Sequence, residues 1–200
     1  KKQMLKKLLI LSAISSSAFV SPIAIAEKVD SFFYFTAIVE RGIETDIDGS
    51  VSETNFSTTS RSTFGGGIGL GYHFDNNLRV ESYVSSAKAE VDSVTVSGTE
   101  YSVDENGTGV GVVLAVAYDF ENESKITPYI EGSYEISWSD NAHNPSTAYG
   151  IALGISSPVA HFTELWGDIG FAITPEQKIN SVSYDAATTW GFSTGLRIRI

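Results

Sequence analysis

Histidine, serine and aspartate lie close together at one point of this sequence, in the combination that a hydrolase would use. His143 and Ser146 occur in the segment SDNAHNPS with Asp140 shortly before them, which supplies a base, a nucleophile and an orienting carboxylate. The segment matches no motif of a lipid hydrolase, and short matches of this kind often arise by chance. We therefore interpret it as a polar loop tip and predict that the protein is not an enzyme.

Two other segments have part of a ligand-binding pattern. The glycines of GGGIGLG, residues 65–71, lack the spacing of a phosphate-binding loop and do not precede a helix. The residues from Asp46 to Ser50 hint at calcium ligation, but the twelve-residue loop with its closing glutamate is missing. The absence of cysteine excludes disulfides, thiol catalysis and cysteine-zinc sites. We predict no cofactor and no metal site.

Most of the remaining ionisable residues lie in segments where polar and apolar residues alternate. The stretch 64–84, FGGGIGLGYHFDNNLRVESYV, shows this most clearly. Apolar residues at every second position oppose glycines before the DNN turn at 75–77, and oppose Arg79 and Glu81 after it. A period of two predicts β-strands with two different faces, joined here in a hairpin. Glycines and charges suit a cramped polar interior, with the apolar face turned to lipid.

The same alternation recurs along the chain and predicts eight strands. We expect them at residues 31–42, 63–74, 78–88, 107–120, 126–138, 148–155, 163–174 and 188–200. Their connections alternate between long and short, and the long, mostly polar ones are expected to be loops, at 43–62, 89–106, 139–146 and 175–186, although 91–96 could extend the strands. Long loops on one side and short turns on the other are typical of an up-and-down barrel.

The first 26 residues have the pattern of a signal peptide. A basic start, KKQMLKK, precedes an apolar segment and an A-x-A end at Ala24 and Ala26, where we expect cleavage. Loss of its four lysines and no acid changes the formal net charge from −11 to −15, which argues against a nucleic-acid partner. The remainder, residues 27–200, is expected to form one domain. Since no apolar helix follows, a membrane protein of this composition must be a closed β-barrel.

The segments GGGIGLGYHFDNNLRVESY, ITPYIEGSY and GFSTGLRIRI resemble the eight-stranded outer-membrane β-barrel family, which includes the OmpA membrane domain, OmpX and the opacity proteins. The resemblance covers residues 30–200 and implies an all-β antiparallel barrel in the outer membrane. Because the odd-numbered connections are the long ones and the even-numbered ones are short, both termini are expected in the periplasm. The resemblance also implies roles in envelope integrity, adhesion or host-surface contact through four loops. The implied partners are lipopolysaccharide and other outer-membrane lipid, periplasmic chaperones and the barrel-assembly machinery, and a host or surface ligand.

Charged residues on the polar face are the candidate site. An eight-stranded barrel is just wide enough for its side chains to fill it, so opposite charges should pair across the lumen. We predict a structural plug there and weigh it against a narrow ion path through a small porin. The sequence also leaves open a lipid-modifying enzyme and a soluble lipocalin-like barrel with the opposite face inside. The predicted network consists of Arg79, Glu81, Glu131, Glu164, Asp168, Arg197 and Arg199.

Overall fold

The structure is a computed structural model that describes residues 31–43, 45–120, 125–139, 145–179 and 182–200. The predicted signal peptide lies outside these residues. Within them the chain forms β-strands joined by turns, and no helix is long and apolar enough to cross a membrane. The strands are β1 (Phe32–Gly42), β2 (Thr45–Val51), β3 (Thr54–His73), β4 (Leu78–Val96), β5 (Thr99–Asp119), β6 (Thr127–Ser139), β7 (Ser146–Ala160), β8 (Thr163–Thr174), β9 (Gln177–Ile179), β10 (Val182–Tyr184) and β11 (Ala187–Arg199).

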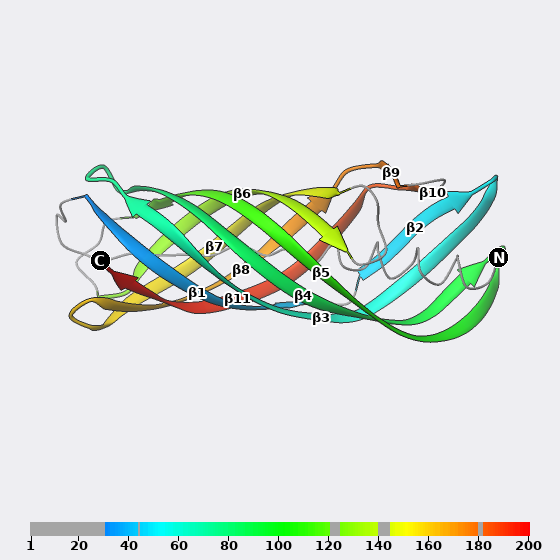
Figure 1. The fold of residues 1–200 in the computed structure, drawn as a ribbon, viewed down its shortest axis with the longest axis horizontal. Helices are drawn as coiled ribbons and strands as arrows, with labels where there is room; N and C mark the ends of the chain where they lie inside the picture. The colour runs from blue at the N-terminus through cyan, green and yellow to red at the C-terminus, as the bar shows by residue number, and fades with distance from the viewer. Residues whose placement is uncertain (1–30, 44, 121–124, 140–144, 180–181) are drawn as a thin grey trace.

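Eight of these strands close into an antiparallel barrel, which confirms the predicted fold (Figure 1). Neighbours along the chain pair with one another from β3 to β8, and β11 pairs with β8. The first strand closes the ring because it pairs with β11 on one side and with β3 on the other. One end of the barrel carries the turns at 74–77 and 161–162, and we call it the turn end. The start of β1 and the last residue of β11 lie at this end.

The opposite end carries a second body of sheet, which we call the lobe (Figure 1). It consists of β2, β9, β10 and the parts of β3, β4 and β5 that extend past the barrel. The part of β3 that extends past its pairing with β1 pairs with β2. On its other side β2 pairs with β10, and β10 pairs with β9. An apolar cluster holds the lobe together, and its buried members are Ile47, Phe56, Ala89, Val91, Val94, Val103, Val182 and Tyr184.

The lobe corrects the predicted loops. Residues 43–62 were expected to form a loop, but they form β2 and much of β3 around a tight turn at Ser52 and Glu53. Residues 89–106 extend β4 and β5, as the alternative for 91–96 allowed, and 175–186 contain β9 and β10. The reason is that apolar residues scattered among the acids face one side and bury against one another. Of the third predicted loop, residues 140–144 lie outside the described part of the chain.

Inside the barrel section the two faces of every strand differ as predicted. On β5, Leu114 is 52% exposed on the outer surface, whereas its neighbour Ala115 is 1% exposed in the lumen. Large apolar side chains are exposed on the outer surface of all eight barrel strands. A lipocalin-like barrel would have the reverse arrangement, with the apolar face inside, so the structure excludes that alternative.

Aromatic side chains gather at both ends of the apolar surface. At the turn end, Phe33 contacts Tyr72 with ring centroids 4.6 Å apart, and Tyr118 contacts Phe120 at 5.5 Å. Toward the lobe, Tyr134 lies 5.2 Å from Tyr149, and a second pair of the same kind joins β8 to β11. Two aromatic belts separated by aliphatic residues are the pattern of a membrane-spanning barrel, whose belts meet the two lipid–water interfaces.

Candidate functional site in the charged lumen

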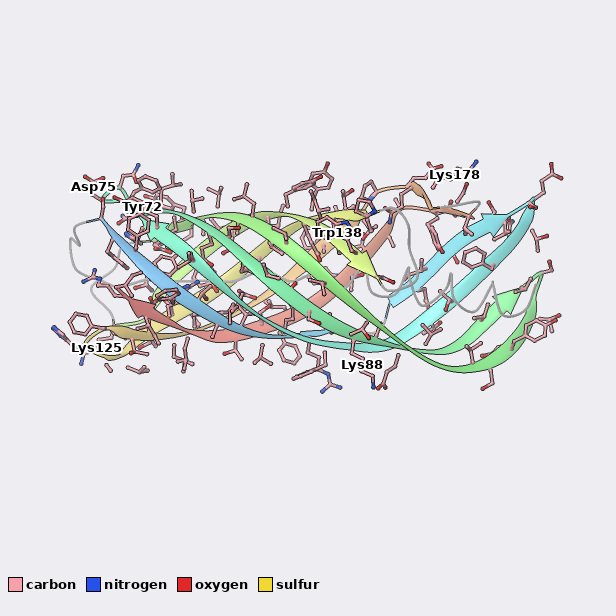
Figure 2. All side chains as sticks on the ribbon, viewed as in Figure 1. Tyr72, Asp75, Lys88, Lys125, Trp138 and Lys178 are labelled. Atoms are coloured by element: carbon pink, nitrogen blue, oxygen red, sulfur yellow. The ribbon has the colours of Figure 1, made fainter. Side chains whose placement is uncertain are left out.

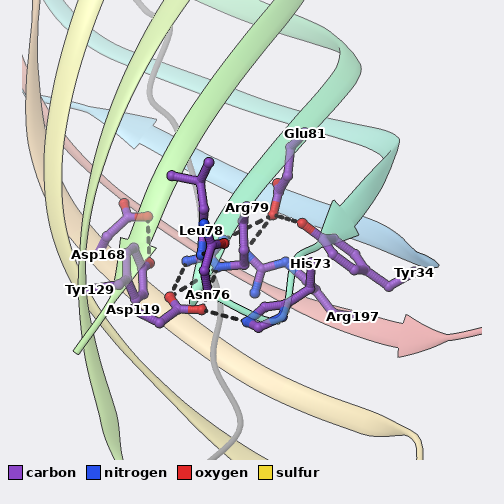
Figure 3. A network of polar contacts seen from close by, with 10 residues as sticks. All are labelled: Tyr34, His73, Asn76, Leu78, Arg79, Glu81, Asp119, Tyr129, Asp168 and Arg197. Carbon is purple, nitrogen blue, oxygen red and sulfur yellow. Dashed lines mark hydrogen bonds and ion pairs between the residues drawn. The ribbon is translucent and has the colours of Figure 1, made fainter. Parts of the chain in front are cut away.

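The lumen of the barrel collects the charged side chains that the sequence places on the polar face. Arg79 and Glu81 lie two residues apart on β4 and therefore point to the same side. Both are fully buried, with exposed fractions of 0% and 1%. Asp119 comes from β5 and Arg197 from β11, so the cluster joins strands that are far apart in the sequence (Figure 3).

Arg79 and Asp119 form the most extensive ion pair of the cluster. The Arg79 Nε atom donates to Asp119 Oδ2 at 2.8 Å, and Nη2 donates to Oδ1 at 2.8 Å. This side-by-side contact uses the fork geometry in which a guanidinium binds a carboxylate most strongly. His73 Nε2 lies 3.2 Å from Asp119 Oδ2, so the carboxylate also joins β3 to β4 and β5.

Glu81 is the centre of the cluster because one of its oxygens has three partners. Its Oε1 atom accepts a hydrogen bond from the Tyr34 hydroxyl at 2.6 Å and lies 3.0 Å from Arg197 Nη2. Arg79 Nη1 donates to the same oxygen at 3.3 Å. The contacts tie β1, β4 and β11 together across the point where the barrel closes (Figure 3).

Aromatic rings cover the guanidinium groups. Arg79 lies over the ring of Tyr129 at 5.1 Å, and Arg197 lies over Trp166 at 5.1 Å. The hydroxyl of Tyr129 donates to Asp168 Oδ2 at 2.9 Å, which brings β8 into the network. Cation–π contacts of this kind gain strength when the cation is removed from water.

The other predicted charges are placed differently. Glu131 is buried on β6, yet neither of its carboxylate oxygens has a hydrogen-bond partner among the residues that the structure describes. Glu164 is buried opposite Arg197 in the β8–β11 register. Arg199 is half-buried at the turn end, with its guanidinium 3.7 Å from the centroid of the Phe32 ring.

Four further residues complete the site, and the predicted network did not contain them. They share the inward face with the predicted charges, and they are Tyr34, His73, Asp119 and Tyr129. The period-two pattern places them on this face. Asp119 is ionisable like the predicted charges, and a rule that counted aromatic hydroxyls and imidazoles as partners of buried charge would have found the other three. Nothing in the pattern shows which partner each one selects.

Glycines face the inward aromatic rings on the neighbouring strands. Tyr34 lies opposite Gly71 in the β1–β3 register, and a Cβ added to this glycine would collide with the tyrosine ring. The same relation holds between Tyr129 and Gly154. In the β8–β11 pair the glycine opposite Trp166 is Gly195. These glycines therefore provide the space in which large rings fill a narrow lumen.

Mostly apolar side chains lie on the lobe side of the ion pairs around Glu81. They form a buried cluster of Ile38, Tyr83, Val113, Ala115 and Trp166. On β4, Tyr83 comes directly after Glu81 on the inward face, and on β8, Trp166 comes directly after Glu164. The lumen is thus filled by ion pairs near the turn end, by this apolar cluster, and by further buried carboxylates, since Glu40 follows Ile38 on β1 and Glu135 pairs in register with Val113.

The candidate hydrolase and calcium segments do not form sites in the described part of the chain. Asp140 and His143 lie outside it, while Ser146 is buried and its hydroxyl accepts a hydrogen bond from Gln177 Nε2 at 2.8 Å. Asp46 accepts a hydrogen bond from Thr59 at 2.6 Å. Among the described residues, no group of three or more histidines and carboxylates is arranged to hold a metal ion.

Comparison with solved structures gives the same fold. Neisserial surface protein A superimposes with a TM-score of 0.57 at 18% sequence identity, over 86% of this chain and 100% of that one. An outer-membrane channel from Pseudomonas putida F1 (TM-score 0.38, 12% identity, 91% and 100% covered) and the β domain of the Bordetella autotransporter BrkA (0.35, 10%, 86% and 100%) are too distant to guide interpretation. No protein-family model and no curated protein sequence matches this chain.

Proposed function

We propose that the protein is an outer-membrane β-barrel whose lumen is a structural plug and whose lobe makes contacts at the cell surface. The observation that carries this proposal is the reversed polarity of the barrel, with apolar side chains such as Leu114 outside and fully buried charges such as Arg79 inside. A surface of this kind is stable in hydrocarbon and would be costly in water. The aromatic belts at both ends support the same placement.

The orientation follows from the two unequal ends. Outer-membrane barrels have short turns on the periplasmic side and longer extensions outside. The turn end therefore faces the periplasm and holds both ends of the barrel section, and the lobe projects from the cell. A protease added to intact cells should cut the lobe and leave the turn at 74–77 uncut. Cleavage at the turn end alone would reverse the assignment.

The plug is favoured over an ion path because buried side chains fill the lumen. The ion pairs around Glu81 cross the lumen, and the large buried rings of Tyr83 and Trp166 occupy it on their lobe side, which leaves little room for a hydrated ion. Planar-bilayer recordings test this choice. The protein should show no large stable openings, whereas porin-like conductance that persists in wild type would favour the small-channel alternative.

The lobe is the part of the protein suited to surface contacts. It carries a groove of about 580 Å³ with a polar lining that includes Asp48, Asn55, Ser97 and Asp185. Adhesion, envelope integrity and binding of a host or surface ligand are the roles we assign to it, and catalysis is not among them. Lipopolysaccharide, periplasmic chaperones and the assembly machinery are the proposed partners of the barrel section.

Heat modifiability tests the barrel assignment as a whole. Every barrel strand has two paired neighbours, so the sheet has no open edge there and should resist SDS at room temperature. Unboiled protein should migrate differently from boiled protein on SDS gels. Identical migration of the two samples, prepared from protein with β-rich circular dichroism, would contradict a closed barrel.

A further inference from the structure

Two cations on the outer surface lie next to one another at the lobe side of the apolar band. Arg41 on β1 and Lys88 on β4 both point outward, and both pair in register with Phe64 of the strand between them. They therefore flank this phenylalanine in one row across three strands. The other outward cations whose side chains are described, Lys125 and Lys178, lie apart from them at the turn end and on the lobe (Figure 2).

The row lies where the apolar surface ends. On β4 the outward positions run from Leu78 at the turn end to Lys88, a distance of ten residues. At about 3.3 Å per residue and a strand tilt of roughly 40°, this spans about 25 Å along the membrane normal, the height of the apolar band of such barrels. Phosphate groups of lipids are found at this depth, just outside the hydrocarbon.

The chemistry of the row matches a lipid with an anionic headgroup. Phe64 is 63% exposed between the cations, and the apolar surface continues toward the turn end through Val39 and Val84. Adjacent strands are about 4.8 Å apart, so the two cation-bearing positions are separated by roughly 10 Å. A single ligand that carries phosphate next to acyl chains can contact both cations and the ring between them.

We propose that Arg41 and Lys88 bind the phosphate groups of a phosphorylated lipid in the lobe-side leaflet, with its acyl chains against Phe64 and the apolar band. This site rests on the proposed membrane placement and assigns its lipid partner to particular residues. One carboxylate opposes it, since Glu90 Oε1 lies 3.2 Å from Lys88 Nζ. Both side chains of that pair are about half exposed, with exposed fractions of 54% and 52%, so the pair is weak enough for a phosphate to displace it.

Lipid binding can be measured on the folded barrel in a neutral detergent, with diphosphoryl lipid A as the probe and native mass spectrometry as the readout. Each cation near a phosphate is expected to contribute about fivefold in affinity. The double variant Arg41→Ala/Lys88→Ala should therefore bind roughly 25-fold more weakly than wild type. The matched control Lys125→Ala/Lys178→Ala removes the same charge elsewhere and should bind as wild type does.

Two further variants fix the sign of the effect. Glu90→Gln removes the opposing carboxylate and should strengthen binding, whereas Arg41→Lys/Lys88→Arg keeps both charges and should retain it. Equal weakening by both double variants, or no weakening by Arg41→Ala/Lys88→Ala, would overturn the site. Release of bound lipid A by millimolar inorganic phosphate would show a free-phosphate site and overturn the lipid assignment. Each variant is first checked for heat modifiability, so a failure of the lipid site is distinguishable from a failure of the barrel.

Discussion

Removal of the Glu81 carboxylate should be among the most damaging single changes in the lumen. Its Oε1 atom has three partners, the Tyr34 hydroxyl at 2.6 Å, Arg197 at 3.0 Å and Arg79 at 3.3 Å. After Glu81→Ala, Arg79 keeps its hydrogen bonds with Asp119, but Arg197 loses the carboxylate that lies 3.0 Å from its Nη2 atom. Leaving a buried charge without its partner costs about 3–5 kcal/mol. We expect the free energy of unfolding to fall by that amount.

A double variant separates the lost attraction from the buried charge that remains. Glu81→Met/Arg197→Met replaces both ends of the pair by apolar side chains of similar length. Removal of both ends of a buried ion pair is often neutral or stabilising. The double variant should therefore be more stable than Glu81→Ala, although it has lost more polar contacts.

The measurement is urea unfolding in lipid vesicles, followed by tryptophan fluorescence and checked by the heat-modifiable band on gels. Trp166 lies in the lumen over Arg197 and reports on the site, while Trp138 and Trp190 are on the outer surface. A loss below about 1 kcal/mol for Glu81→Ala would mean that water enters the lumen and solvates the arginine. A double variant less stable than Glu81→Ala would show that the ion pair itself stabilises the barrel, which is the opposite of the expected order.

Three other substitutions test the packing of the barrel and the lobe, each by the change in the free energy of unfolding. Leu114→Arg should cost about 2–4 kcal/mol because it places a cation at mid-depth in lipid. The control Tyr118→Arg lies at the turn-end belt and should cost clearly less. Equal costs would contradict the depths assigned to these two residues in the membrane. Gly195→Ala should destabilise the barrel by about 1–3 kcal/mol because the added Cβ meets Trp166 and a backbone carbonyl. In Gly132→Ala the added Cβ meets nothing within 4 Å, so this substitution should be neutral. Equal effects would refute the idea that Gly195 makes room for Trp166. Glu53 has a φ of 68°, which glycine adopts more easily than residues with a Cβ, so Glu53→Gly should stabilise the lobe by about 1 kcal/mol. Unchanged resistance of the lobe to protease would refute this prediction.

The faces of the barrel strands could be predicted from the sequence because a period of two needs only local information. Leu114 and Ala115 differ by one position and lie on opposite sides, as the pattern requires. The partners of Glu81 were beyond such reasoning. Tyr34 and Arg197 reach this carboxylate only because β1 closes the ring between β3 and β11, and the stagger of that closure is a property of the whole barrel.

The lobe was missed for a different reason. Its strands consist mostly of acidic and hydroxyl residues with few apolar ones. A single apolar residue such as Ile47 or Val182 does not produce the alternation that marks the buried face of a strand. Their burial depends on contacts between β2 and β10, which are more than 120 residues apart in the sequence. An apolar cluster assembled from such distant strands has no local signature, and the segments resemble polar loops until the fold is known.

The lumen shows how one narrow barrel can be filled with residues that are unusual in a protein core. Buried charge is tolerated around Glu81 because Asp119 and Glu81 pair with arginines whose faces are covered by rings. Those rings in turn need glycines opposite them, as Gly154 is opposite Tyr129. Glycine weakens an isolated strand. In a closed barrel that loss is offset, because each strand is paired on both sides and its glycines accommodate the aromatic rings that exclude water from the ion pairs. The glycine-rich stretch of β3 and the charges on β4 are therefore coupled, and a substitution in either should change the packing around the other.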